Sequence, residues 1–254
     1  MKMNFNFNDG PLPPRNVCEP HMPVVILIDN SGSMFGQAIS NVEKSVNRFA
    51  ADICKDPKAA DRVDICVMSF NESVTVLQDW CPITEMRKVE LSAGGGTNMS
   101  AALRKAVDKL RERGHLYENN GIEVRMPYLI ILTDGMGDNI DQIAEEIRDR
   151  TNSKKMLPWF LGVNGYDKTT AGMITEGKRV FELTDENGYD FTDFFKVMEV
   201  SIKAVSTSAP GAKPVIKDEE NPLNQKDCGV RVVNIDDCNG VQREHNKKLN
   251  NGLP

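Results

Sequence analysis

An unbroken apolar run that ends at an acidic residue is the feature that most constrains this fold. Residues 24–28 read VVILI and are followed directly by Asp29. A continuous run of β-branched and aliphatic residues is typical of a strand buried on both faces, as in a parallel sheet covered by helices. A second run, residues 128–133, ends in the same way at Asp134. We therefore expect a parallel sheet that carries two carboxylates at the ends of its strands.

The segments between and after these runs show the periodicity of further helices and strands. Apolar residues recur at helical spacing in four segments, and a shorter helix is expected near residues 169–176. These four segments are residues 39–53, 99–110, 140–147 and 191–205. Further strands are expected at residues 63–70, 74–77, 157–163 and 179–183. The three-residue link 71–73 predicts a hairpin, so residues 74–77 would run antiparallel at the edge, followed by a long loop over residues 79–96.

Strands that alternate with helices predict a sheet with helices on both faces. We expect an α/β, Rossmann-like, doubly wound fold with a mostly parallel six-stranded sheet, order 3-2-1-4-5-6, and one antiparallel edge strand. The domain would span residues 23–206, after an irregular N-terminal arm over residues 1–22. Residues 207–254 contain many Pro, Asn and Lys residues, which is typical of a linker and a partly disordered tail. Within this tail, residues 230–235 have the pattern of one added strand.

Composition excludes several classes of protein. The 31 Lys and Arg residues against 37 Asp and Glu give a formal net charge of −6, which argues against a general nucleic-acid binder. No run approaches the ~20 apolar residues that span a bilayer, and residues 1–23 lack the apolar core of a signal peptide. The six cysteines form no CxxC framework and are interpreted as reduced thiols, with a zinc site from Cys18, His21, Cys228 and Cys238 as a weak alternative. We therefore expect a cytoplasmic protein.

Five oxygen-bearing side chains are expected to converge at the ends of the first and fourth strands. If the strand order is as predicted, Asp29 and Asp134 face one crevice at the point where the winding reverses. Ser31 and Ser33 follow Asp29 at alternate positions, with Gly32 allowing a tight turn. The flexible loop of residues 94–96 would bring Thr97 to the same point. The candidate metal site is therefore Asp29, Ser31, Ser33, Thr97 and Asp134.

This set of three hydroxyls and two carboxylates suits a hard cation. Mg²⁺ prefers about six oxygen ligands, and protein hydroxyls fill only part of that shell, so one position stays open for water or an outside ligand. Mn²⁺ and Ca²⁺ are alternatives. Each residue alone has a structural reading as a helix cap or turn residue, and the glycine loop lacks the Lys-Ser/Thr ending of a phosphate loop. No histidine offers Ser31 a convincing general base, so we expect no catalytic residues and no enzyme.

The motif Asp29-x-Ser31-x-Ser33, Thr97 and the turn at residues 133–135 resembles the metal-ion-dependent adhesion site (MIDAS) of von Willebrand factor A (VWA) domains. The resemblance covers about residues 20–206, and it is strongest to the bacterial TerY-type group associated with tellurite resistance, on residues 94–103 and 117–135. It implies the VWA fold, with Ser31, Ser33 and Thr97 holding the metal directly. Asp29 and Asp134 would then act mostly through bound waters, and a partner carboxylate would complete the shell.

The resemblance implies a metal-dependent protein-interaction module of a bacterial stress-response system, tellurite-resistance-like, with a protein kinase and a phosphatase among its partners. A metal-dependent phosphoester hydrolase and a surface adhesion protein are the alternatives. Three residues beside the site, Met34, Phe35 and Met136, are equally well interpreted as exposed partner contacts or as buried packing.

Overall fold

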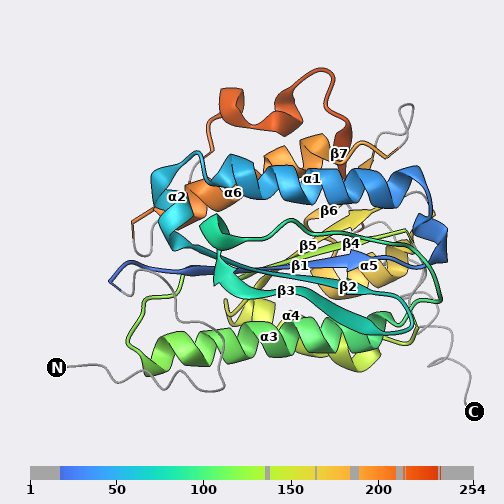
Figure 1. The fold of residues 1–254 in the computed structure, drawn as a ribbon, viewed down its shortest axis with the longest axis horizontal. Coiled ribbons are helices and arrows are strands. Elements are labelled where there is room, and N and C mark those ends of the chain that lie inside the picture. Colours follow the sequence, from blue (N-terminus) through green and yellow to red (C-terminus); the bar gives the residue numbers. More distant parts are fainter. Residues whose placement is uncertain are drawn as a thin grey trace, which may run out of the picture.

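The computed structural model describes residues 18–134, 138–163, 165–183, 189–209, 214, 216–233 and 235. Within these residues, one seven-stranded sheet has the order β3-β2-β1-β4-β5-β6-β7 (Figure 1). The strands are β1 (Met22–Asp29), β2 (Val63–Phe70), β3 (Val74–Pro82), β4 (Tyr128–Thr133), β5 (Leu157–Gly162), β6 (Val180–Leu183) and β7 (Val230–Val233).

Helices cover both faces of this sheet. They are α1 (Gln37–Ile53), α2 (Pro57–Arg62), α3 (Met99–Asn119), α4 (Asp141–Asn152), α5 (Lys168–Thr175) and α6 (Thr192–Thr207). Figure 1 shows α1 and α6 above the sheet and α3 and α4 below it. Successive side chains of β1 point to opposite faces of the sheet. Val24 and Ile26 pack against α1 and α6, whereas Val25 and Leu27 pack against α3 and α4.

The predicted α/β architecture is confirmed, including the order of the first six strands. The β1, β2, β4, β5 and β6 strands pair in parallel, and β3 pairs antiparallel with β2 at one edge. The added strand expected within residues 230–235 is β7, which pairs antiparallel with the other side of β6 and brings the six strands expected in the domain to seven. The added strand is stabilised by Arg231, whose guanidinium lies 2.7 Å from the Glu182 carboxylate on β6. Both edges of the sheet are therefore antiparallel.

Two further elements differ from the sequence prediction. The β3 strand continues to Pro82, because Trp80 and Cys81 are buried, where the prediction placed a loop from residue 79. The short helix α2 was not predicted. It begins with Pro57 after Asp56, whose carboxylate accepts hydrogen bonds from the backbone N–H groups of residues 58 and 59. Residues 1–17 of the expected arm and residues 236–254 of the expected tail lie outside the described residues.

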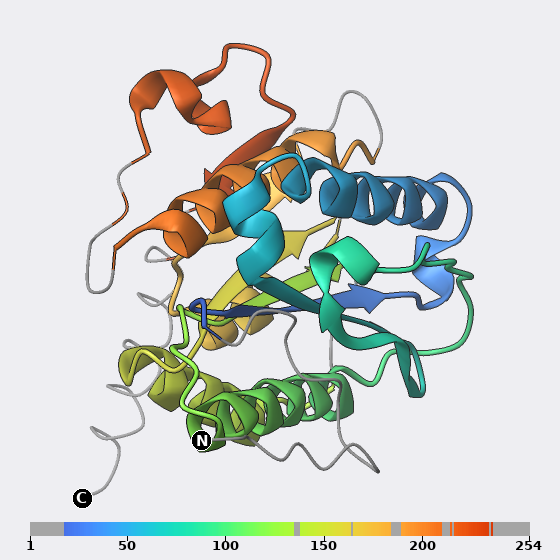
Figure 2. The ribbon, with the colours of Figure 1, turned by 60° about the vertical axis from the view of Figure 1, so that its left-hand side comes forward.

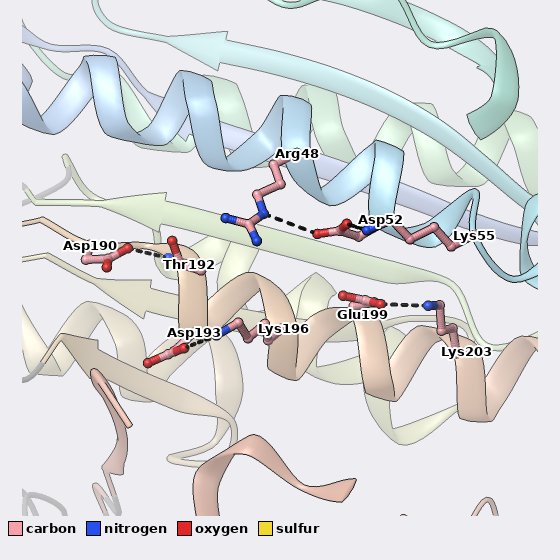
Figure 3. A network of polar contacts seen from close by, with 9 residues as sticks. All are labelled: Arg48, Asp52, Lys55, Asp190, Thr192, Asp193, Lys196, Glu199 and Lys203. Atoms are coloured by element: carbon pink, nitrogen blue, oxygen red, sulfur yellow. Dashed lines mark hydrogen bonds and ion pairs between the residues drawn. The ribbon is translucent and has the colours of Figure 1, made fainter. Parts of the chain in front are cut away.

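The chain after α6 returns to the sheet across the outside of that helix. Figure 2 shows residues 216–233, with the short turns η3 (Asp218–Glu220) and η4 (Pro222–Asn224), arching over α6 before β7. The Gly229 N–H donates a hydrogen bond to the Asp193 carboxylate of α6 over 2.8 Å. Figure 3 shows ion pairs within each of the two neighbouring helices, Arg48 with Asp52 on α1, and Lys196 with Asp193 and Lys203 with Glu199 on α6. In the described part of the chain, no helix is both long and apolar enough to cross a membrane.

Candidate metal centre

The two acidic residues that end the apolar runs lie at the same end of neighbouring strands. Asp29 is the last residue of β1, and Asp134 directly follows β4. These strands pair in parallel from Val24 opposite Tyr128 to Ile28 opposite Leu132. The winding of the sheet reverses here, because the chain adds β2 and β3 on one side of β1 and then β4, β5 and β6 on its other side. Such a reversal is where ligands bind in open α/β sheets.

Asp29 is completely buried, and protein donors hold both of its carboxylate oxygens. One oxygen, Oδ1, accepts a hydrogen bond from the Ser31 N–H over 2.8 Å. The other, Oδ2, accepts one from the Thr133 hydroxyl over 2.6 Å. The carboxylate is therefore fixed between the end of β1, the loop that follows it and the end of β4. This arrangement rules out a role for Asp29 as the cap of α1, whose N-cap is Gly36.

The two serines and Asp134 form a chain of hydrogen bonds. The Ser31 and Ser33 hydroxyl oxygens lie 3.0 Å apart, and the Ser33 hydroxyl donates to Asp134 Oδ1 over 2.7 Å. Because Ser33 has only one hydroxyl proton, the Ser31 hydroxyl is the donor to Ser33. Two ligands at right angles around Mg²⁺, each at roughly 2.1 Å, lie about 3.0 Å apart. The two spacings, 3.0 Å between the serine oxygens and 2.7 Å from Ser33 to Asp134, are therefore close to that of neighbouring positions in a magnesium shell.

The charge of Asp134 is disfavoured where the carboxyl group stands. Burial raises the pKa of Asp134, the hydrogen bond from Ser33 lowers it, and the neighbouring Asp29 carboxylate raises it, so that the pKa lies above the ordinary value. Two partly desolvated carboxylates close together favour a bound cation, which offsets their repulsion. The electrostatics of the site and its oxygen spacing thus point to the same kind of ligand.

The glycine loop lies beside Ser31, as the sequence analysis expected. The Gly32 N–H donates to the Gly95 carbonyl over 3.0 Å, and the Gly94 N–H donates to the Asn30 carbonyl over 2.9 Å. Gly95 has φ of +80°, a conformation that side chains disfavour. Thr97 follows this loop and is half-buried, but its hydroxyl makes no hydrogen bond to the described residues. The structure therefore brings together four of the five candidate residues by direct contacts and places the loop of the fifth beside them.

Three supporting residues were missed by the sequence analysis. The Asn30 amide donates to the Ser92 carbonyl over 2.8 Å. The Asn71 amide donates to the Gly94 carbonyl over 2.9 Å, and the Glu72 carboxylate accepts from the Gly96 N–H over 3.1 Å. Together they attach the glycine loop to the end of β1 and to the β2–β3 turn. The sequence predicts a short turn at residues 71–73, but the length of a turn does not predict where its side chains point.

Residues around the site divide into buried and exposed positions. Met34 is fully buried, whereas the Phe35 side chain is 81% exposed, and Gly135 and Met136 lie outside the described residues. Asp141 stands in the first turn of α4. The Asp138 carboxylate accepts a hydrogen bond from the Ser100 N–H of α3 over 2.9 Å. Phe35 is thus a large apolar side chain that is exposed beside the candidate site.

The described histidines and cysteines lie away from this site. His21 contacts the buried Asp64 over 2.7 Å near the start of β1, and His115 is on α3 beside Glu118. His245 and Cys238 fall outside the described residues. Among the residues that are described, no three His, Cys, Asp or Glu side chains form a metal-binding group, so the weak zinc alternative gains no support there.

Comparison with known proteins agrees with this fold. The sequence profile of the von Willebrand factor type A domain matches residues 24–136. Proximal thread matrix protein 1 from the mussel byssus has a TM-score of 0.51 at 20% identity, covering 74% of this chain and 47% of that one. A von Willebrand factor type A structure from Catenulispora acidiphila has a TM-score of 0.53 at 15% identity, covering 73% and 43% respectively. The chain thus spans less than half the length of these solved proteins, and no curated protein matches it.

The fold and the sequence match define the class of protein. The molecule is an α/β protein whose sheet and helices form the von Willebrand factor type A fold. Residues 24–136 match the von Willebrand factor type A domain, and the hydrogen-bonded residues at the ends of β1 and β4 lie within this matched segment.

Proposed function

We propose that this protein is a metal-dependent interaction module that captures an acidic residue of a partner protein. Asp29, Ser31, Ser33, Thr97 and Asp134 would hold one Mg²⁺-type cation at the end of β1 and β4. When bound, the cation would supply an electrophilic point for an external carboxylate. VWA domains typically act in this way, as metal-dependent modules that bind protein partners.

The observation that carries the proposal is the spacing of the oxygens from Ser31 through Ser33 to Asp134, at 3.0 and 2.7 Å. Two of these three ligands are neutral hydroxyls, so they neutralise little of the charge of a divalent cation. A cation held in this way keeps a strong attraction for an outside anion. The protein oxygens also leave part of a six-ligand shell free.

The surface beside the site supports a protein as the partner. Phe35 stands two residues after Ser33 and is 81% exposed, while the preceding Met34 is buried and anchors the turn. Aromatic side chains contribute strongly at the centres of protein interfaces. The partner would therefore present an acidic residue next to an apolar surface that covers Phe35.

The finer assignment rests on the sequence motifs. We place the module in the cytoplasm, in a bacterial stress-response system of the TerY type, where a protein kinase and a phosphatase would be among its partners. The resemblance of residues 94–103 to that group supports this. Cys54, Cys66 and Cys81 are free thiols, which is consistent with a reducing compartment. The proposal includes no catalytic activity.

The test begins with the metal alone. Calorimetric titration of Mg²⁺ and Mn²⁺ into the purified protein should show one site, and Ser33→Ala and Asp134→Ala should each abolish or strongly weaken it. Asp141→Ala is the matched control, because this carboxylate stands at the same edge but outside the hydrogen-bonded chain. Equal metal binding by all four proteins would contradict the assignment of the site.

Partner capture is tested next. The immobilised protein should retain a partner in Mg²⁺ and release it in chelator, and Phe35→Ala should weaken capture while leaving metal affinity unchanged. Changing one acidic residue of the captured partner to its amide should abolish retention. Capture that persists in chelator and in Asp134→Ala would refute a metal-dependent mode.

The alternative of a phosphoester hydrolase is tested in the same preparations. Hydrolysis would require the cation to activate a water molecule on the phosphate ester. Mg²⁺-dependent turnover of a phosphoester that is lost in Asp134→Ala would replace the binding proposal with an enzymatic one. The alternative of a surface adhesion protein would be favoured if cell fractionation found the protein at the cell surface.

A further inference from the structure

A concave site lies at the end of the sheet opposite the candidate metal centre. A cleft of about 560 Å³ is bordered by the end of α3, the end of α4 and residues 124–127, which lead into β4. The candidate metal centre lies beyond the other end of β4, after residue 133. Six residues of strand span about 20 Å, so the two sites do not overlap. The left side of Figure 1 shows this end, where α3 finishes.

The lining of this cleft is strongly cationic. It contains five Lys and Arg side chains and a single carboxylate, Glu118, which lies 3.5 Å from His115. Arg111 and Arg125 form ion pairs with neighbouring acidic residues. The other three cations stand at the end of α4 and have no ion-pair partner within the described residues. These three are Arg150, Lys154 and Lys155.

The Arg150 guanidinium is partly buried, and one of its buried nitrogens, Nε, has no hydrogen-bond partner in the described part of the structure. Leaving a donor of a charged group buried and unpaired is costly, so such groups in native proteins usually await a ligand or a bound water. In a cleft of this charge, an anion is the ligand that would pair with it.

Helix capping does not explain these cations. Basic residues often stabilise the last carbonyls of a helix, but here backbone groups already do so. The Lys155 N–H donates to the Arg150 carbonyl over 2.8 Å, and the Lys154 N–H donates to the Thr151 carbonyl over 3.0 Å. This is the pattern of a Schellman cap, in which the residue at the position of Lys154 is usually glycine.

Lys154 occupies that glycine position with a φ of 56°. A side chain in this left-handed conformation is disfavoured relative to glycine. Backbone strain of this kind concentrates at functional sites. The strain at Lys154 is thus a second observation, independent of the unpaired Arg150, and both belong to the wall of the same cleft.

We infer that this cleft binds a small organic phosphate, of the class of a nucleoside diphosphate. Three unpaired cations suit the multiple charge of a diphosphate better than a single carboxylate, and guanidinium and ammonium groups both recognise phosphate oxygens. The volume falls in the range of small-molecule sites. Apolar side chains complete the lining and would contact the organic part of the ligand. These are Leu110, Val124, Met126 and Pro127.

The test uses the full chain in chelator, so that binding at the metal centre does not contribute. Calorimetric titration with ADP should show one saturable site that weakens as salt is added. Arg150→Gln should lower the affinity for ADP by about tenfold to a hundredfold, as expected for loss of a charged hydrogen bond. Lys44→Gln is the matched control, because Lys44 is an exposed lysine on α1, on the other face of the sheet.

Lys154→Gly separates a ligand-binding role from a structural one. It should raise the melting temperature, because glycine accepts the positive φ, and at the same time weaken ADP binding several-fold. A variant that gains stability and keeps full ADP affinity would overturn the assignment of Lys154. Titration with inorganic phosphate distinguishes the source of affinity, since weaker binding than ADP supports an organic ligand.

Three results would overturn the inference itself. They are no saturable ADP binding by the unmodified chain, equal binding by Arg150→Gln, and binding that requires Mg²⁺ and is lost in Asp134→Ala. The last result would move the ligand to the metal centre, so the failure of this inference remains distinguishable from the failure of the proposed function.

Discussion

Replacing Thr133 by valine tests how the sheet positions the candidate metal centre. The Thr133 hydroxyl donates to Asp29 Oδ2 over 2.6 Å, and both residues are fully buried. Valine has nearly the same shape, so the substitution removes a donor without opening a cavity. The Asp29 carboxylate would lose one of the hydrogen bonds that compensate for its burial.

The magnitude follows from the charge of the acceptor and from its burial. Hydrogen bonds to charged groups contribute about 1.5–3 kcal/mol, so we expect a loss of roughly 2 kcal/mol in the free energy of unfolding. For a domain of this size, that corresponds to a fall of about 4–8 °C in melting temperature. Because groups that orient metal ligands typically change affinity by 10–100-fold, Mg²⁺ affinity should fall by a factor in about this range.

Urea unfolding in chelator and Mg²⁺ titration measure the two effects separately. Thr175→Val is the matched control, since Thr175 is 1% exposed and donates to the neutral carbonyl of Ala171 over 2.7 Å. The control should lose less stability, about 1 kcal/mol, and retain full metal affinity. Unchanged metal binding by Thr133→Val, or an equal effect of Thr175→Val on metal affinity, would refute the positioning role of Thr133.

Two further substitutions test the electrostatics of the fold. Asp64→Ala removes the carboxylate beside the buried Arg113 guanidinium and should lower the free energy of unfolding in urea by about 3–5 kcal/mol. The control Asp61→Ala, on the exposed side of α2, should change this free energy by less than about 0.5 kcal/mol. Similar losses for both variants would contradict the view that Asp64 compensates the buried charge of Arg113. Asp134→Asn should raise the melting temperature of the metal-free protein at neutral pH while abolishing its response to Mg²⁺. Because the folded-state pKa of Asp134 is raised, ionisation of this carboxyl group opposes folding. The gain in stability of Asp134→Asn over the unmodified protein should therefore grow as pH rises through that pKa and then level off. A gain that shrinks with rising pH would show that the pKa is lowered in the folded state.

The central strands could be predicted because their sequence signals are strong and local. Both faces of β1 and β4 are buried, which requires the continuous apolar runs that end at Asp29 and Asp134. The β7 strand has only four residues, and its central Arg231 is exposed, so its sequence carries a weak signal. Its place in the sheet depends on pairing with β6, a long-range interaction that local periodicity does not contain.

The candidate site shows the same division between local and long-range information. The alternate spacing of Asp29, Ser31 and Ser33 is visible in a short stretch of sequence. Asp134 was assigned to the same site only because the strand order was assumed. The roles of Asn30 and Asn71 depend on hydrogen bonds to Ser92 and Gly94 in a distant loop. Asp138 precedes α4 in the sequence, but its carboxylate accepts a hydrogen bond from the start of α3, a contact between residues far apart in the chain.

The direction of the hydrogen bonds gives the candidate site a further property. An ionised Asp134 only accepts hydrogen bonds, so it orients the Ser33 hydroxyl proton toward itself. Ser33 is then the acceptor for the Ser31 proton. Each serine oxygen therefore keeps a lone pair that is not committed within the chain, although its proton is engaged. A cation can bind these lone pairs without breaking either hydrogen bond. The hydrogen-bond directions that stabilise the metal-free site therefore also leave its serine oxygens available as metal ligands.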